Sequence, residues 1–165
     1  MKPDSSDKKK QLADCLSCLP RKVLQLHGRD NVAEFVLHEL ARPDHFNLHR
    51  AAYIIDNPDF DYLKGVAGFD HQEQYNGQDD IWQNPDSFSK HMAGCPFNKK
   101  VRQFGMHSCR RKGCDDKQTV QEVAEKLGFS SPRFYAWDLK HDNHGILLYE
   151  KQEEEECDCD YLLDG

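Results

Sequence analysis

The first half of the chain places apolar residues at helical spacing in two segments. Between residues 12 and 19 the apolar positions lie three or four residues apart, which predicts a helix over residues 7–19. This helix is expected to end at Pro20, because proline has no backbone N–H to donate inside a helix. Residues 32–40 repeat the spacing and precede Pro43. The pattern therefore predicts two N-terminal helices.

Strand patterns follow in two places. Short apolar runs at residues 51–55 and 62–69 flank the turn residues Asn57 and Pro58, and this arrangement predicts a β-hairpin. Near the end of the chain, residues 133–139 alternate aromatic and polar side chains and precede a polar turn and a short apolar run. That alternation predicts a second hairpin.

The two predicted hairpins are separated by a polar stretch and a helical one. Residues 70–90 are rich in Gln, Asn and Asp, and they are expected to form a long surface loop or a helix that the pattern does not reveal. Residues 119–127 recover helical spacing and are followed by Gly128, a residue that often ends helices. A third helix is therefore predicted here.

Together these elements predict an α+β fold. We expect a single domain in which N-terminal helices and two β-hairpins, forming one antiparallel sheet with a helix packed on it, share a core. Residues 1–10 are expected to be a flexible N-terminal tail, residues 11–150 the globular domain, and residues 151–165 an acidic C-terminal tail.

The composition of the chain and the motifs that it lacks limit the classes of function that the sequence allows. The chain has 165 residues, of which 38% are hydrophobic and 31% charged, with a formal net charge of −7. Its longest apolar run is far below the roughly 20 residues that span a bilayer, so no membrane partner is expected. The first residues carry no apolar signal segment, which predicts a cytoplasmic protein with reduced cysteines. Phosphate-loop and dinucleotide-binding glycine patterns are also absent from the sequence.

Cysteine and histidine gather in the middle of the chain and suggest a metal site. Tetrahedral zinc takes four nitrogen or sulfur ligands, and pairs a few residues apart let one loop supply two of them. The nearby arginines and lysine would favour thiolates by lowering their pKa. The sequence therefore predicts a structural zinc bound by a Cys3His set: Cys95, His107, Cys109 and Cys114.

A basic segment at residues 99–117 overlaps this cluster. Such a segment favours contact with phosphates, so nucleic acid or another anionic partner is the expected ligand of this surface. The predicted contact residues are basic: Lys99, Lys100, Arg102, Arg110, Arg111, Lys112 and, further along the chain, Arg133.

Residues 121–134 add a motif to this hypothesis. Ala124 stands inside the predicted helix, Gly128 follows at its end, and Ser131 and Pro132 could cap and start a second helix. In these positions the segment resembles the helix-turn-helix of AraC-type regulators. The resemblance implies a nucleic-acid-binding element over residues 119–137, whereas the aromatic alternation in the same stretch favours a strand.

These observations leave three classes of function open. The leading hypothesis is a small intracellular binding protein with a structural zinc site. The first alternative is a nucleic-acid-binding protein that uses the basic segment and the helix-turn-helix-like element. The second is a thiol- or metal-dependent enzyme, because catalytic groups converge in space and leave no mark in a single sequence. The sequence pattern predicts neither a substrate nor an oligomeric state.

Overall fold

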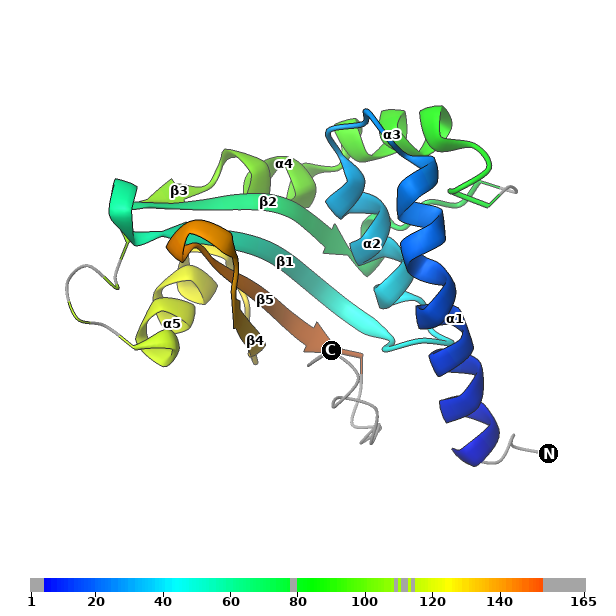
Figure 1. Cartoon of the computed structure of the whole chain (residues 1–165), viewed down its shortest axis with the longest axis horizontal. Coiled ribbons are helices and arrows are strands. Elements are labelled where there is room, and N and C mark those ends of the chain that lie inside the picture. The colour runs from blue at the N-terminus through cyan, green and yellow to red at the C-terminus, as the bar shows by residue number, and fades with distance from the viewer. Residues whose placement is uncertain (1–4, 78–79, 109, 111–112, 114, 153–165) are drawn as a thin grey trace.

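The structure is a computed structural model that describes residues 5–77, 80–108, 110, 113 and 115–152. These residues form one antiparallel sheet of five strands, in the order β3-β2-β1-β5-β4, and the helices that pack on it (Figure 1). The strands are β1 Leu48–Asn57, β2 Tyr62–Asp70, β3 Gly105–Met106, β4 Arg133–Asp138 and β5 His144–Lys151. The helices are α1 Ser5–Gln25, α2 Val32–Ala41, α3 Pro85–Gly94, α4 Pro96–Gln103 and α5 Asp116–Leu127. The predicted α+β fold with two hairpins is confirmed.

Helices cover both faces of the sheet, because successive residues of a strand point to opposite faces. On one face, the helices α1 and α2 bury a cluster that includes Leu12, Leu37, Phe46, Ala51 and Leu147. On the other face, α4 and α5 bury a second cluster that includes Ala52, Ile54, Val101, Val123 and Leu148. A third cluster joins α1, α2 and α3 around Phe35, Trp82 and Phe88. The sheet is thus the central layer of three.

Helix α4 lies unusually close to β2. Gly65 and Gly68 of β2 face Val101 of α4, and a Cβ atom at Gly65 would overlap the backbone carbonyl of Val101. The amide of Gly65 also donates a hydrogen bond to the carbonyl of Phe104, directly after α4. The two glycines therefore have a packing role, because they let a helix backbone approach a strand backbone.

Two N-terminal predictions have different outcomes. The helix over residues 32–40 is confirmed as α2. Helix α1 was predicted to end at Pro20, and this boundary is wrong, because α1 continues through Pro20 to Gln25. Leu12 on one side of the proline and Leu26 just beyond the helix are both buried. Burial of apolar residues on both sides of Pro20 offsets the lost backbone hydrogen bond.

The helix-turn-helix prediction is wrong. Its first helix exists as α5, which has a capping box at Asp115 and Gln118 and ends at Gly128 with a φ of 80°. Its second helix does not exist, because Arg133–Asp138 form β4 and pair with β5 along their whole length. The aromatic alternation decided between the two, since Phe134 and Tyr135 pack into clusters on opposite faces of the sheet.

The polar stretch after β2 contains a helix that the sequence pattern did not reveal. Helix α3 begins at Pro85 and α4 begins at Pro96, and proline suits the first position of a helix, where its missing donor costs nothing. Phe88 and Met92 are the buried residues of α3. Two buried residues four positions apart are too few to distinguish a helix from a loop that has isolated buried side chains.

Candidate functional site: an apolar groove beside β4

The two described residues of the predicted zinc set, Cys95 and His107, lie in different parts of the structure. Cys95 is buried at the junction of α3 and α4. His107 is exposed, and its Nδ1 lies 3.0 Å from Oδ2 of Asp61 at the turn between β1 and β2. Cys109 and Cys114 lie outside the described residues. Among the residues that the structure describes, no three His, Cys, Asp or Glu side chains are arranged to hold a metal ion. The zinc set stays a prediction.

Cys95 has a neighbour that the zinc set did not include. Its Sγ lies 3.4 Å from Nε2 of His91, one helical turn earlier, and 3.3 Å from the His91 carbonyl oxygen. The same Nε2 lies 2.6 Å from the carbonyl oxygen of Glu73. A carbonyl only accepts, so Nε2 carries the hydrogen and donates it to Glu73. His91 therefore has no lone pair at Nε2 with which to take the thiol proton.

The electrostatics of Cys95 agree with this geometry. Burial and the nearby carboxylates of Glu73 and Glu34 raise the pKa of the Cys95 thiol to about 11. A nucleophilic cysteine needs a lowered pKa or an adjacent base. This pair lacks both features, so it supports packing at the helix junction rather than the thiol chemistry of the enzyme alternative.

Metal content tests the zinc prediction directly. If the Cys3His set binds zinc, the chain purified without chelator should carry about one zinc, and Cys109→Ser and Cys114→Ser should each release it and lower stability, because structural zinc contributes folding free energy. Cys18→Ser is the matched control, since Cys18 is an exposed thiol of α1 outside the set. A metal-free mass in native mass spectrometry would contradict the prediction.

Several basic side chains of residues 99–117 form ion pairs or hydrogen bonds with other residues of the fold. Arg102 lies 2.8 Å from a carboxylate oxygen of the buried Glu34. Arg110 pairs with Asp116 and lies 3.5 Å from the buried Asp56, and Lys100 donates to the carbonyl of Leu127. Arg111 and Lys112 lie outside the described residues, while Lys99 on α4 is exposed and Arg133 begins β4. Cations committed to internal partners contribute less to a phosphate-binding surface, so nucleic-acid binding stays an untested prediction.

The pair between Asp56 and Arg110 joins β1 to the segment that leads into α5. Asp56 is fully buried, and neither of its carboxylate oxygens has a hydrogen-bond partner among the described residues. A buried carboxylate requires a nearby cation, and Arg110 supplies it. The sequence pattern does not single out Asp56, because it does not distinguish a buried aspartate at a strand end from an exposed one in a turn.

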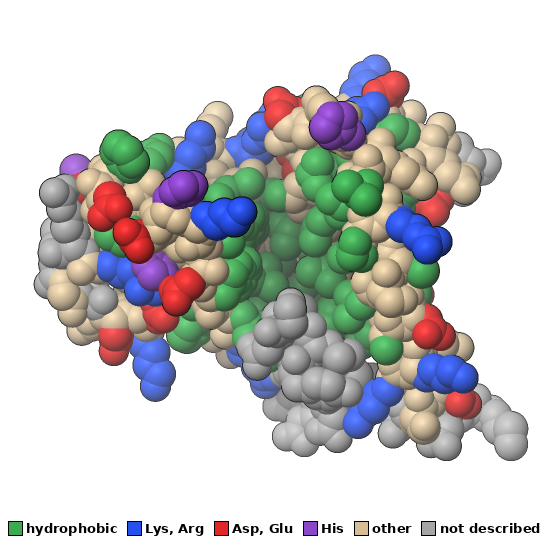
Figure 2. Space-filling model, viewed as in Figure 1, with side chains coloured by type: hydrophobic (Ala, Val, Ile, Leu, Met, Phe, Trp, Pro, Cys, Tyr) green, Lys and Arg blue, Asp and Glu red, His purple; other side chains and the backbone are tan. Residues whose placement is uncertain are grey.

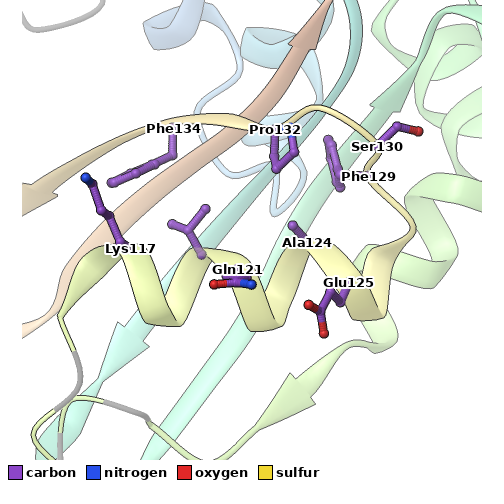
Figure 3. Close-up of a pocket in the computed structure, with 9 residues that line it drawn as sticks. Lys117, Gln121, Ala124, Glu125, Phe129, Ser130, Pro132 and Phe134 are labelled. Atoms are coloured by element: carbon purple, nitrogen blue, oxygen red, sulfur yellow. The ribbon is translucent and has the colours of Figure 1, made fainter.

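Two cavities flank β4, one on each face of the sheet. The cavity on the α5 side has a volume of about 350 Å³. Figure 3 shows Phe129, Pro132 and Phe134 over α5, whose Ala124 points toward them. Its rim also carries Lys117 and Glu125, along with other polar side chains. This cavity therefore mixes charged and apolar surface.

The cavity on the other face is a groove between α2 and the strands β1, β5 and β4, with a volume of about 290 Å³. Among the described residues, no charged side chain lines it. Its lining is Val32, Ala33, Val36, Leu37, Leu40, Tyr53, Trp137 and Leu147. The α2 residues share one side of the helix because they lie three or four positions apart. Figure 2 shows hydrophobic side chains gathered in a hollow in the middle of this face of the molecule. We call this cavity the α2–β4 groove.

Two aromatic rings form the sheet side of the α2–β4 groove. The rings of Tyr53 and Trp137 are parallel within 3°, with centroids 5.8 Å apart. Trp137 is 39% exposed, which is high for so large an apolar side chain in a folded protein. Gly145, its cross-strand partner, makes room for the indole, since a Cβ atom there would lie within 3 Å of it. The groove thus presents an aromatic surface to solvent.

The hydroxyl group of Tyr53 is a polar group of the groove lining, and it is uncharged. Burial raises the pKa of the Tyr53 phenol, so the hydroxyl stays protonated at neutral pH. The sequence pattern predicts the helix over residues 32–40 and the alternating strand over residues 133–139. This pattern does not show that the helix and the strand lie side by side, because α2 and β4 are about a hundred residues apart in the chain.

None of the helices among the described residues is long and apolar enough to cross a membrane. Comparison of the chain with protein-family models, curated proteins and solved structures gives no match.

Proposed function

We propose that this protein binds a small, uncharged, apolar molecule in the α2–β4 groove. The observation that carries the proposal is the groove itself: a hollow of about 290 Å³ lined by aliphatic and aromatic side chains, with the indole of Trp137 partly exposed at its edge. Ligand sites are concave and mostly apolar, with a few polar groups that orient the ligand.

The lining indicates the chemistry of the ligand. A charged ligand would lose its hydration without gaining an ion pair, so the groove disfavours it. A planar aromatic or alicyclic body fits better, because it can stack on the ring of Trp137 while its edge contacts Val36 and Leu40 of α2. The Tyr53 hydroxyl offers a hydrogen bond to one polar atom of such a ligand. The volume limits the ligand to the small end of the range for pocket-bound molecules.

The proposal belongs to the class of binding proteins and requires no catalytic group. It is independent of the predicted zinc set and of the basic segment, because neither Cys95 nor any of the predicted nucleic-acid-binding residues lines the groove.

Binding of the neutral fluorescent probe phenylnaphthylamine tests this function. We expect saturable binding, with energy transfer from Trp137 to the probe in a Trp82→Phe background, since Trp82 lies in the third cluster. Trp137→Ala should weaken binding about tenfold, because stacking and burial on one aromatic side chain contribute on the order of 1.4 kcal/mol. Ala33→Phe fills the groove from α2 and should weaken binding without removing the aromatic surface.

Phe60→Ala is the matched control for these variants. Phe60 is an apolar side chain that is 81% exposed in the turn between β1 and β2, and it is not among the lining residues of the groove. The Phe60→Ala substitution should leave the affinity for the probe unchanged. Equal affinity in the parent chain, Trp137→Ala and Ala33→Phe would overturn the proposed function, as would the lack of saturable binding to any of them.

A further inference from the structure

The segment that follows β5 begins at the end of a strand that helps to line the α2–β4 groove. The described chain ends at Gln152, whose amide donates a 3.1 Å hydrogen bond to the carbonyl of Asn47, just before β1. This bond fixes the point where the chain leaves the sheet. Leu147 of the groove lies five residues earlier on β5, which corresponds to about 17 Å along a strand. The groove is therefore within a short distance of the exit point.

Residues 153–165 combine a long acidic run with one apolar triplet. Tyr161, Leu162 and Leu163 are consecutive, and the eight residues that separate them from Gln152 include four glutamates and two aspartates. An extended segment of eight residues spans up to about 26 Å, which exceeds the separation from Gln152 to Leu147. The triplet can therefore return to the groove without any change in the sheet.

We propose that residues 161–163 of the same chain occupy the α2–β4 groove and compete there with the apolar ligand. The competition rests on the proposed function, whereas the contact itself does not. The chemistry of the two parts matches: the groove has an apolar lining, and the triplet is the only run of apolar residues in the segment. The acidic residues on either side of the triplet can stay in water, because the groove is open to solvent at Trp137.

A covalent link makes a weak contact effective. A segment tethered by a short flexible linker experiences an effective concentration in the millimolar range. Even a contact with a dissociation constant near this value would therefore fill the groove for about half of the time. Free ligand must then displace the triplet, so the apparent affinity of the groove is lower than its intrinsic affinity.

The basic segment at residues 99–117 is the competing location for these acidic residues. Its Arg102 and Arg110 already pair with the buried carboxylates of Glu34 and Asp56. A contact of the acidic residues with this segment would weaken steeply with added salt, whereas an apolar contact in the groove would persist. Salt dependence therefore distinguishes the two locations.

The experiment uses the full chain and two matched double variants. Leu162→Asp/Leu163→Asp removes the apolar triplet, whereas Glu154→Gln/Glu155→Gln removes two charges and keeps the triplet. We expect the first variant to shift the Trp137 indole and Leu147 amide resonances at low and at high salt, and the second to leave them in place. Probe affinity should rise about two- to tenfold in the first variant and stay unchanged in the second.

The outcomes separate this inference from the proposed function. If the Trp137 and Leu147 resonances of Leu162→Asp/Leu163→Asp coincide with those of the parent chain, the contact does not exist, even if the probe binds. If the resonances shift and the probe binds none of the chains, the contact stands and the proposed function fails. Shifts that appear only in residues 99–117, and only at low salt, would place the acidic residues on the basic segment and overturn the inference.

Discussion

Gly65→Ala is expected to lower the free energy of unfolding by about 3 kcal/mol or more, because overpacking a tight contact displaces structure that has no room to relax. The added methyl group would overlap the carbonyl of Val101, a backbone atom of α4 that cannot rotate away. Val101 is fully buried, so α4 would have to move off β2 as a unit. Urea unfolding of the variant and the parent chain measures the difference.

Gly94→Ala is the control for this prediction. Gly94 closes α3, and a Cβ atom there would meet no atom within 4 Å. The substitution should change stability by less than about 1 kcal/mol, in the stabilising direction, because alanine loses less backbone entropy than glycine on folding. Similar losses for the two variants would mean that the approach of α4 to β2 is not the cause. A Gly65→Ala chain as stable as the parent would contradict the close contact itself.

Gly65 and Gly68 of β2 show which features of the fold a sequence pattern can predict and which it cannot. They interrupt the apolar run at residues 62–69, which was predicted to be a strand, and β2 confirms that prediction. The pattern could not predict that a helix packs against them, because α4 is separated from β2 by a polar stretch with little periodicity. Elements with long, regular periodicity, such as α2 and α5, were predicted well, since each carries its own signal.

The candidate site was predictable only in parts. The stripe of α2 and the alternation of Tyr135 and Trp137 are local patterns, and both were visible in the sequence. Their convergence depends on the strand order β1-β5-β4, which is set by long-range pairing. The zinc prediction relied on residues that lie close together in sequence. In the fold, Cys95 lies beside His91, whereas His107 contacts Asp61. Cys109 and Cys114 lie outside the described residues, so the zinc set stays a prediction.

Stability is expected to fall as the pH drops below about 6.5, and His38 of α2 should contribute a large part of this fall. Its ring is buried between Phe69 and Phe88, with centroid distances of 5.2 Å and 4.9 Å. Burial, followed by the nearby His91, lowers the pKa of His38 to about 4, while Glu39 opposes this shift and Arg42 adds to it. The native state therefore keeps the imidazole neutral over a pH range in which the unfolded chain binds a proton.

The sign and size of the effect follow from this difference. Well above pH 6.5 neither state protonates His38, so its contribution to stability is complete. As the pH falls through 6.5 toward 4, the unfolded chain binds the proton first, and protonation favours the unfolded chain. Between about pH 7.5 and about pH 5 the loss from this one group is about 2 kcal/mol. His38→Phe keeps an aromatic ring and removes the titration, so urea unfolding across this range should show a weaker pH dependence by that amount. Parallel pH dependences of the parent chain and the variant would show that His38 is accessible to protons in the native state. Because α2 also lines the groove, the affinity for phenylnaphthylamine should persist on acidification only while this helix remains folded.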